Sequence, residues 1–581
     1  IFLVVLSCSF FANTLYLHQF QTCKLTKLSF TSLGNESFVG IYAKNCPEWF
    51  LTAFGCIQQS IVIVPLYDTL DANAASYIVN QTQMQVVVVD STDKIGKLLT
   101  NKICPSLRHI IVIPKSDLKE FAAIDPDVQS TTASNIAMDK RQNVTQTLKN
   151  FYTSGTTGPP KGVILTHRNL VSSVSSFYIL VDKCAPRMFN MRKVLLSFLP
   201  LSHMMEQLDH WCTILMGGAV GYYSGTIQGL MNDAAALKPT IFPVVPRLLN
   251  RLYDTIQANV QKSGWFKRAI FNFAYNRKLA LLKKGIFCND TIWDRLVFSK
   301  IQSKLGGCVQ MMATGSAPVS KEVLETCRIV LGAAILEAYG QTECTAIATI
   351  TWLTDNTAGH CGGPATCTVL KLADVPEMNY YASEGKGEIV VKGPNNTQGY
   401  FKDPEKTAEL FDKDGYLHTG DVGQLLPGGR LKIIDRKKHI FKLAQGEYVA
   451  PEKIENVYIR VPCVQQVFVD GDSLESYLVA IVVPEEDVIR DWFKQNVDTK
   501  NQSYEAILKD EKVRKYVLDE MQKTGKQNKL NSIEQVKAVY LTADPFTVEN
   551  GLLTPTLKAK RPQLRQRYAD EIKQLYNKSK Q

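Results

Sequence analysis

The sequence predicts an α/β fold: a large N-terminal domain of two α/β subdomains plus a small β-barrel, and a small α+β domain at the C-terminus. Three observations support this. Short β-branched strands alternate with helical patterns to about residue 345, short strands with Gly/Pro turns cover 361–435, and charged helices accompany strands after Asp435. Alternating strands and helices are typical of parallel βαβ units. The 581 residues also exceed one ordinary domain.

The first subdomain is expected to begin near residue 38. Its helices are predicted to start at Pro47 and to cover 72–79 and 95–99, while the polar stretch 115–147 is expected to be a loop or surface insertion. Its strands are predicted at 39–42, 60–65, 86–89 and 109–113.

The second subdomain, at about 160–345, carries long helical patterns at 248–260 and 266–284. Strands at 388–393 and 429–434 predict the small barrel. The C-terminal domain is expected to combine strands at 467–470 and 478–483 with helices within 486–527 and 562–577. No internal repeat is visible.

The composition narrows the class of partner. The net charge is +11, from 66 basic and 55 acidic residues, which suits anionic small ligands or an anionic membrane surface. No zinc-finger spacing and no long Lys/Arg tract supports nucleic-acid binding, so we expect no nucleic acid as a partner. The 14 cysteines include no Cys-x-x-Cys pair, which favours reduced thiols.

Residues 1–37 form an atypical N-terminus. The chain opens without methionine and stays mostly apolar to Ala12, which is shorter than the ~20 residues of a membrane-spanning helix. Two interpretations stay open for this segment: the remnant of a membrane anchor, or a mis-assembled stretch of sequence.

A loop rich in hydroxyls and glycines follows Tyr152. Such a loop can direct backbone N–H groups and hydroxyls at one anion, because glycine permits left-handed backbone and close approach. A flexible surface linker can have the same composition, and Pro160-Lys161-Gly162 replaces the Gly-Lys-Ser/Thr ending of a Walker A loop. The candidate phosphate-binding residues are Thr153, Ser154, Gly155, Thr156, Thr157, Gly158 and Lys161.

A second signal is the run Tyr339, Gly340, Gln341, Thr342, Glu343 after an apolar strand. Open α/β sheets bind ligands at the carboxyl ends of their strands. The chemistry of this run fits ATP. Tyr339 can lie along the adenine, Thr342 can contact the α-phosphate, and Glu343 can ligate Mg²⁺, which binds few carboxylates besides phosphate oxygens.

Two further candidates lie later in the chain. Asp421, at a tight glycine turn, can accept hydrogen bonds from the ribose hydroxyls, with support from Arg436. Charged turns, however, are usually only solvated surface. Lys558 follows a Gly/Pro-framed loop, from which an ammonium can stabilise charge that develops in a transition state.

Together these motifs resemble the acyl-adenylate-forming (AMP-binding) superfamily. The run 435–455, with Leu-Ala-Gln-Gly-Glu-Tyr at 443–448, is similar to eukaryotic long-chain fatty acyl-CoA synthetases. The stretches 199–203, 242–247 and 314–318 also fit this family, and the resemblance runs from about residue 38 to the end.

The resemblance implies ATP, Mg²⁺ and coenzyme A as cofactors, and conversion of a long-chain fatty acid to acyl-CoA with release of AMP and pyrophosphate. It implies that His203 lies near the acyl site and Gly315 near the nucleotide, and that Lys558 contacts the carboxylate and the α-phosphate. It divides the chain into an N-terminal domain, 38–435, and a mobile C-terminal domain, 436–581. The hinge is implied at Lys438, and Lys442 faces the site in the thioester-forming state.

The chain departs from the family pattern in two places, and two other functions stay open. Residues 1–37 do not resemble the family, and the strand before the phosphate loop, 147–151, is unusually polar. The alternatives are another acyl-adenylating enzyme, such as a luciferase-like oxygenase or a peptide-synthetase adenylation domain, and a truncated, inactive binder of fatty acid or nucleotide. We expect a membrane surface as partner, on the cytosolic face of the endoplasmic reticulum first and of the mitochondrial outer membrane second.

Overall fold

The computed structural model describes most of the chain. No helix within this part is both long enough and apolar enough to cross a bilayer. Nearly all of the loop expected at 115–147, and most of 1–37, lie outside it. The described residues are 3–5, 37–99, 104–113, 129–130, 147–153, 160–184, 193–226, 229–317, 319–437, 439–444, 447–472, 474–497, 502–554 and 558–578.

The first subdomain is built on a seven-stranded sheet, with strand order β6-β5-β4-β2-β3-β7-β8. Its neighbours are parallel except β7 and β8, which are antiparallel. The strands are β2 (Phe38–Tyr42), β3 (Val62–Pro65), β4 (Val86–Val89), β5 (His109–Val112), β6 (Gln129–Ser130), β7 (Thr147–Thr153) and β8 (Lys161–Thr166). The helices are α2 (Pro47–Gln58), α3 (Ala72–Thr82) and α4 (Thr92–Leu99).

Local sequence explains these elements. The four valines of β4 are all buried, as expected for a strand covered on both faces. Pro47 opens α2, where its missing N–H costs nothing. Asp71 caps α3 by accepting a hydrogen bond from the Ala74 N–H at 2.8 Å.

The polar lead-in to the phosphate loop forms a strand despite its composition. β7 pairs with β3 on one side and with β8 on the other. The buried Tyr152 in β7 donates a hydrogen bond from its hydroxyl to Gln81 at 2.7 Å. Thr153 and Lys161 are partners across β7 and β8, so the two ends of the predicted phosphate loop lie side by side.

The second subdomain contains two strand groups joined through Ile241, which bridges to Leu195 and to Met311. Leu3–Val5 forms the edge strand β1, antiparallel to β10. The other strands are β9 (Val194–Ser197), β10 (Ala219–Tyr222), β11 (Met311–Thr314), β12 (Ala334–Tyr339), β13 (Thr349–Ile350) and β14 (Gly363–Pro364). The main helices are α5 (His167–Cys184), α7 (Met204–Leu215), α8 (Leu230–Leu237), α9 (Pro246–Lys262), α10 (Trp265–Leu282) and α12 (Lys321–Leu331).

A four-stranded antiparallel sheet stands where the small barrel was predicted. Its strands follow chain order: β15 (Val369–Ala373), β16 (Lys386–Lys392), β17 (Leu417–Leu426) and β18 (Arg430–Arg436). Helix α13 (Pro404–Leu410) lies against β17. Asp421 in β17 is the direct cross-strand partner of Arg436 in β18.

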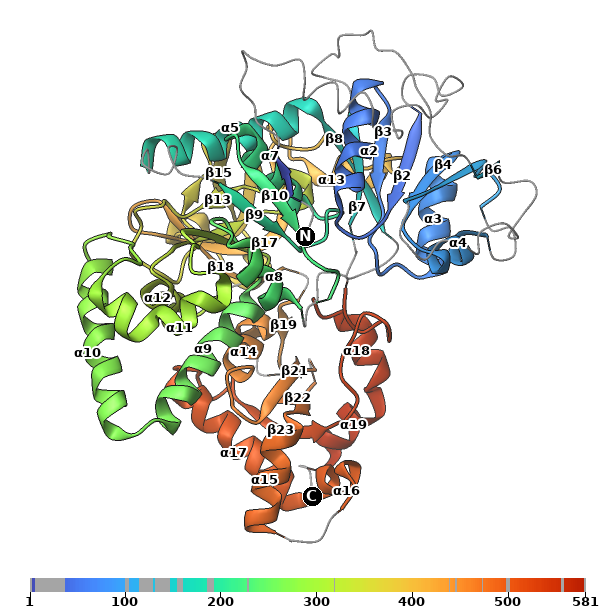
Figure 1. The fold of residues 1–581 in the computed structure, drawn as a ribbon. Helices are drawn as coiled ribbons and strands as arrows, with labels where there is room; N and C mark the ends of the chain where they lie inside the picture. The colour runs from blue at the N-terminus through green and yellow to red at the C-terminus, as the bar shows by residue number, and fades with distance from the viewer. Residues whose placement is uncertain are drawn as a thin grey trace.

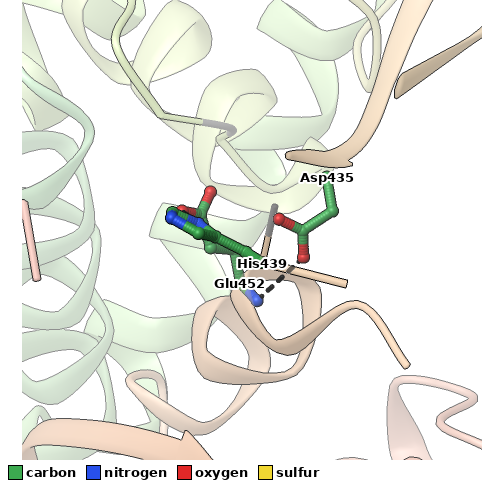
Figure 2. Close-up of side chains that lie close together, drawn as sticks. All are labelled: Asp435, His439 and Glu452. Atoms are coloured by element: carbon green, nitrogen blue, oxygen red, sulfur yellow. Dashed lines mark hydrogen bonds and ion pairs between the residues drawn. The ribbon is translucent and has the colours of Figure 1, made fainter. Parts of the chain in front are cut away.

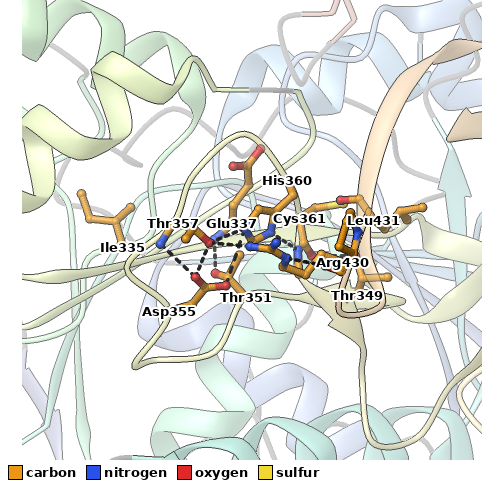
Figure 3. Close-up of polar contacts among 12 residues, drawn as sticks. Ile335, Glu337, Thr349, Thr351, Asp355, Thr357, His360, Cys361, Arg430 and Leu431 are labelled. Carbon is orange, nitrogen blue, oxygen red and sulfur yellow. Dashed lines mark hydrogen bonds and ion pairs between the residues drawn. The ribbon is translucent and has the colours of Figure 1, made fainter. Parts of the chain in front are cut away.

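A polar network ties this antiparallel sheet to the second subdomain (Figure 3). The Thr357 hydroxyl accepts a hydrogen bond from Arg430 at 3.1 Å and donates one to Asp355 at 2.5 Å. Beside it, the Cys361 N–H donates to the Leu431 carbonyl at 2.8 Å. The network therefore fixes β18, and with it the site residues of β17 and β18, relative to β12.

The C-terminal domain forms a separate unit, drawn in orange and red in Figure 1. Strand β22 (Leu478–Pro484) is wholly buried and lies between β21 (Val464–Asp470) and β23 (Val536–Leu541). Alternate residues of β22 join two different cores, which explains its continuous apolar sequence. Its helices are α14 (Pro451–Tyr458), α15 (Glu486–Asn496), α16 (Tyr504–Lys509), α17 (Glu511–Gln527), α18 (Arg561–Arg567) and α19 (Ala569–Lys578).

The predicted fold class is confirmed: a mixed α/β structure with a large N-terminal and a small C-terminal domain. The exact division at residues 435 and 436 stays a prediction.

Candidate active site

One cavity of about 470 Å³ collects residues from all parts of the chain. Residues in or next to β8, β11, β12, β17 and β18 meet there with a loop of the C-terminal domain. The residues predicted from the sequence that line it are Lys161, His203, Gly315, Gly340, Thr342, Glu343, Asp421, Arg436 and Lys558.

Asp421 and Arg436 form a charged pair at one wall of the cavity. The Arg436 Nε lies 3.5 Å from one oxygen of Asp421, and the Tyr339 hydroxyl donates to the other at 2.8 Å. Burial raises the pKa of Asp421, whereas Arg436 opposes that shift. Tyr339 ends β12, as the sequence predicts, and contacts the cavity wall through Asp421. It is not among the residues that line the cavity, and its contact with adenine stays a prediction.

Glu343 has a partner that sequence reasoning missed. The Tyr400 hydroxyl donates to one carboxylate oxygen of Glu343 at 2.8 Å. The Lys161 ammonium lies 4.9 Å from the centre of the Tyr400 ring, within cation–π range. Tyr400 therefore connects the strand after the phosphate loop with Glu343. The two residues are 57 positions apart, and no local pattern marks Tyr400 as part of a site.

Two glycines of the cavity wall lie very close to neighbouring backbone segments. A Cβ atom on Gly340 would lie 2.2 Å from the Ala346 carbonyl oxygen, and one on Gly315 would lie 2.9 Å from that of Ala338. Both positions therefore require glycine so that neighbouring backbone segments can approach.

His203 is the N-cap residue of α7. Its Nδ1 accepts a hydrogen bond from the Met205 N–H at 3.2 Å, so the ring proton belongs on Nε2. Burial, and then the charge of Lys558, lower the pKa of His203 to about 4. The ring is therefore neutral near pH 7 and can donate one hydrogen bond from Nε2.

Lys558 reaches the cavity from the C-terminal domain, just before α18. Its backbone is held by Thr554: the Thr554 N–H donates to the Lys558 carbonyl at 2.8 Å, and the Thr554 hydroxyl accepts from the Lys558 N–H at 3.0 Å. Burial and the nearby Arg436 lower the pKa of Lys558 to about 8. Glu452, Asp421 and Glu343 work in the other direction and preserve its positive charge near neutral pH.

Apolar side chains and an acid of α7 also line the cavity. Phe177, Leu208, Ile347 and Ile350 line it together with Asp209 of α7. Burial raises the pKa of Asp209 to about 8, so its carboxyl is protonated near pH 7. Asp209 was not among the predicted residues, because an acid on a helix usually signals a solvated face.

A compact polar group lies at the junction of the domains (Figure 2). Asp435 accepts hydrogen bonds from the Arg436 N–H at 2.6 Å and from the Glu452 N–H at 3.1 Å. The His439 Nδ1 lies 2.9 Å from a Glu452 oxygen. Among the described residues these three side chains are close enough to share a cation. The bond from the Glu452 N–H to Asp435 connects the end of β18 with the start of α14.

The other predicted site residues lie next to, or outside, the described residues. Thr153 ends β7, and Lys442 belongs to the short strand β19 (Phe441–Lys442), paired with β20 (Tyr448–Val449). The roles predicted for these two side chains stay predictions. Ser154, Gly155, Thr156, Thr157, Gly158 and Lys438 lie outside the described residues.

Comparisons with known proteins agree with this arrangement. The family model of the AMP-binding enzymes matches residues 28–401, and the model of their C-terminal domain matches 453–528. In structure, the chain is similar to the A domain of carboxylic acid reductase from Segniliparus rugosus. The TM-score is 0.75 at 22% identity, covering 97% of this chain and 86% of that one, which supports the shared fold. The chain is therefore an AMP-binding enzyme.

Similarity in sequence is more specific. The chain is 48% identical to long-chain-fatty-acid–CoA ligase 1 of Cavia porcellus, over 93% of this chain and 78% of that protein. It is 46% identical to long-chain-fatty-acid–CoA ligase 6 of Homo sapiens, over 93% and 79%. Long chain acyl-CoA synthetase 7, peroxisomal, of Arabidopsis thaliana is 42% identical, over 94% and 79%. The chain belongs to the long-chain-fatty-acid–CoA ligase family.

Proposed function

We propose that this enzyme activates long-chain fatty acids to acyl-CoA in two steps, with ATP and CoA as co-substrates and AMP and pyrophosphate as products. One observation carries the proposal. A lysine of the C-terminal domain, Lys558, enters a cavity that is lined both by the charged residues Asp421, Arg436 and Glu343 and by apolar side chains suited to an acyl chain.

In the first step an oxygen of the fatty acid carboxylate attacks the α-phosphorus of ATP, and the bond to pyrophosphate breaks. The enzyme's contribution is to position the reactants and to stabilise the transferred charge. Asp421 and Arg436 would hold the ribose, and Thr153 to Lys161 would hold the β- and γ-phosphates. Lys558 would contact both the carboxylate and the α-phosphate, while the neutral His203 would donate a hydrogen bond near the acyl carbonyl.

Mg²⁺ is expected with ATP. The Tyr400 hydroxyl occupies one oxygen of Glu343, which leaves the second oxygen as a ligand for a hard cation. A bound Mg²⁺ would neutralise charge on the pyrophosphate leaving group. Tyr400 would keep the Glu343 carboxylate in the orientation that this ligand role requires.

In the second step the CoA thiolate attacks the acyl carbon, and AMP leaves with its phosphate oxygen. We propose that the C-terminal domain rotates about Lys438 between the two steps, so that Lys442 replaces Lys558 at the site. The described arrangement, with Lys558 in the cavity, fits the adenylate-forming state.

The proposal includes a location. A long-chain fatty acid partitions into membranes, and the net charge of +11 favours an anionic surface. We propose the cytosolic face of the endoplasmic reticulum as the site of action, with the mitochondrial outer membrane as the second choice.

A pyrophosphate-exchange assay tests the reaction. Palmitate should support exchange of pyrophosphate into ATP without CoA, and addition of CoA should yield palmitoyl-CoA and AMP in equal amounts. Exchange that does not depend on a fatty acid, or a product other than acyl-CoA, would contradict the proposal. A panel of acids from medium to very long chain then defines the preferred length.

A further inference from the structure

Helix α10 lies at the periphery of the molecule (Figure 1). An exposed apolar stripe runs along this helix. Phe266, Ile270, Phe273 and Arg277 are spaced so that they share one face of the helix. The side chains of Phe266 and Phe273 are 61% and 50% exposed, and Trp265 before them is 79% exposed. Helix α10 buries a different face, with Ala274, Lys278 and Leu282, against its neighbours.

The stripe continues into the next segment of the chain. The rings of Phe273 and Trp293 make an edge contact, with centroids 5.2 Å apart. Beside Trp293, Ile292 and Leu296 are 62% and 70% exposed. Soluble proteins rarely expose several large apolar side chains together without a partner for them. We call these exposed residues of 265–296 the α10 patch.

The stretch of sequence that carries the α10 patch is strongly basic. Over residues 262–304, nine lysines and arginines are exposed against a single exposed acid, Asp290. The sequence of α10 contains no acidic residue at all. Arg277 lies on the stripe itself, with its guanidinium carbon 5.1 Å from the centre of the Phe273 ring. The patch therefore combines aromatic rings with positive charge.

We propose that the α10 patch docks the enzyme on an anionic lipid bilayer, with the aromatic rings in the headgroup region and the basic side chains on the lipid phosphates. Aromatic and basic residues on one helix are the composition of interfacial membrane-binding helices. The inference rests on the proposed long-chain substrate, because such acids are delivered from a bilayer.

The charge argues against a second copy of this chain as the occupant. A symmetric dimer places the same patch of each subunit against the other, so the two basic stretches would face and repel each other. An anionic bilayer supplies the opposite charge, with an attraction that salt weakens.

Sedimentation of the full chain with lipid vesicles tests the proposal. We expect tighter binding to phosphatidylcholine vesicles that contain phosphatidylserine than to phosphatidylcholine alone, with binding weakened by salt. The double variant Phe266→Ser/Phe273→Ser should bind at least tenfold more weakly. Arg277 and Lys284 are two of the nine exposed basic residues of 262–304. Arg277→Gln and Lys284→Gln should each weaken binding about fivefold, on the anionic vesicles only.

Matched controls remove exposed groups elsewhere. Val369→Ser/Leu474→Ser and Lys413→Gln/Lys432→Gln change exposed apolar and basic side chains outside the patch, and should bind as the unchanged chain does. Octanoate-dependent pyrophosphate exchange without vesicles should be unchanged in every variant, which separates failure of docking from failure of the proposed reaction.

Unaltered vesicle binding by the patch variants would overturn the proposal. So would light scattering that shows a dimer of the unchanged chain converted to monomers by Phe266→Ser/Phe273→Ser, with vesicle binding unaffected.

Discussion

At the scale of single residues, the cavity is organised by pairs that set charge and orientation. Tyr339 and Arg436 hold the two oxygens of Asp421, and Tyr400 holds one oxygen of Glu343. His203 is kept neutral by burial and by Lys558. Each pair joins residues from different elements, so the geometry of the site depends on how the sheets pack together.

We expect Tyr400→Phe to raise the concentration of Mg²⁺-ATP needed for half-maximal exchange by about tenfold, because a hydrogen bond to a charged group contributes about 1.5–3 kcal/mol. Titration of ATP and of Mg²⁺ in the exchange assay measures this. Tyr416→Phe, which changes a tyrosine of the same region that does not line the cavity, is the control.

The Glu343→Ala variant decides how Tyr400 acts. It should use Mg²⁺-ATP poorly, and adding Tyr400→Phe to it should have little further effect, since the hydrogen bond is already lost. Independent, additive losses from the two substitutions would show that Tyr400 does not work through Glu343.

The raised pKa of Asp209 predicts that fatty acid binding depends on pH. Its pKa is raised to about 8 by burial, so the carboxyl is neutral below that pH and gains a negative charge as the pH rises through it. The KM for the fatty acid should therefore increase above about pH 8, while Asp209→Asn, which cannot ionise, should keep a flatter profile. Parallel profiles for both proteins would rule out Asp209 as the group that titrates.

At the scale of elements, individual polar contacts help to position the C-terminal domain on the N-terminal domain. Besides the hydrogen bond between Glu452 and Asp435, Arg460 after α14 lies 3.4 Å from Glu322 of α12. This ion pair spans the two domains in the state that puts Lys558 in the cavity. It is partly exposed, so its contribution should be modest.

We expect Glu322→Arg to slow adenylate formation by about threefold to tenfold through like-charge repulsion with Arg460, with thioester formation from supplied acyl-adenylate unaffected. The charge-swapped double variant Glu322→Arg/Arg460→Glu should recover most of the loss. Failure of the swap to restore the rate, measured in stopped-flow single turnovers, would argue against the contact as a determinant of domain docking.

Local sequence patterns predicted many helices and strands closely. The strand predicted at 86–89 is β4, and the helices predicted at 248–260 and 266–284 are α9 and α10, with ends shifted by at most two residues. Side-chain periodicity and β-branched runs are local signals. The contacts of Tyr400 with Glu343 and of Tyr339 with Asp421 link residues 57 and 82 positions apart, which no local signal reports. Asp209 was missed because its apolar surroundings come from several elements.

At the scale of the whole molecule, two domains share one site. The N-terminal domain supplies the residues proposed for nucleotide and metal, and the C-terminal domain supplies Lys558 from a loop held by Thr554. The proposed rotation of the C-terminal domain would present different groups to successive steps, and a loss at Lys558 should then be confined to one of them. The α10 patch lies on the N-terminal domain, so the proposed membrane contact involves no residue of the C-terminal domain.

The half-reactions of Lys558→Ala test this account most directly. Fatty-acid-dependent pyrophosphate exchange should fall by at least a hundredfold, because the ammonium that stabilises the developing charge is lost. Conversion of supplied palmitoyl-adenylate and CoA to palmitoyl-CoA should stay near the rate of the unchanged enzyme. Lys560→Ala, which removes a lysine two positions away that does not line the cavity, should retain both activities. An equal loss of both half-reactions in Lys558→Ala would contradict the account.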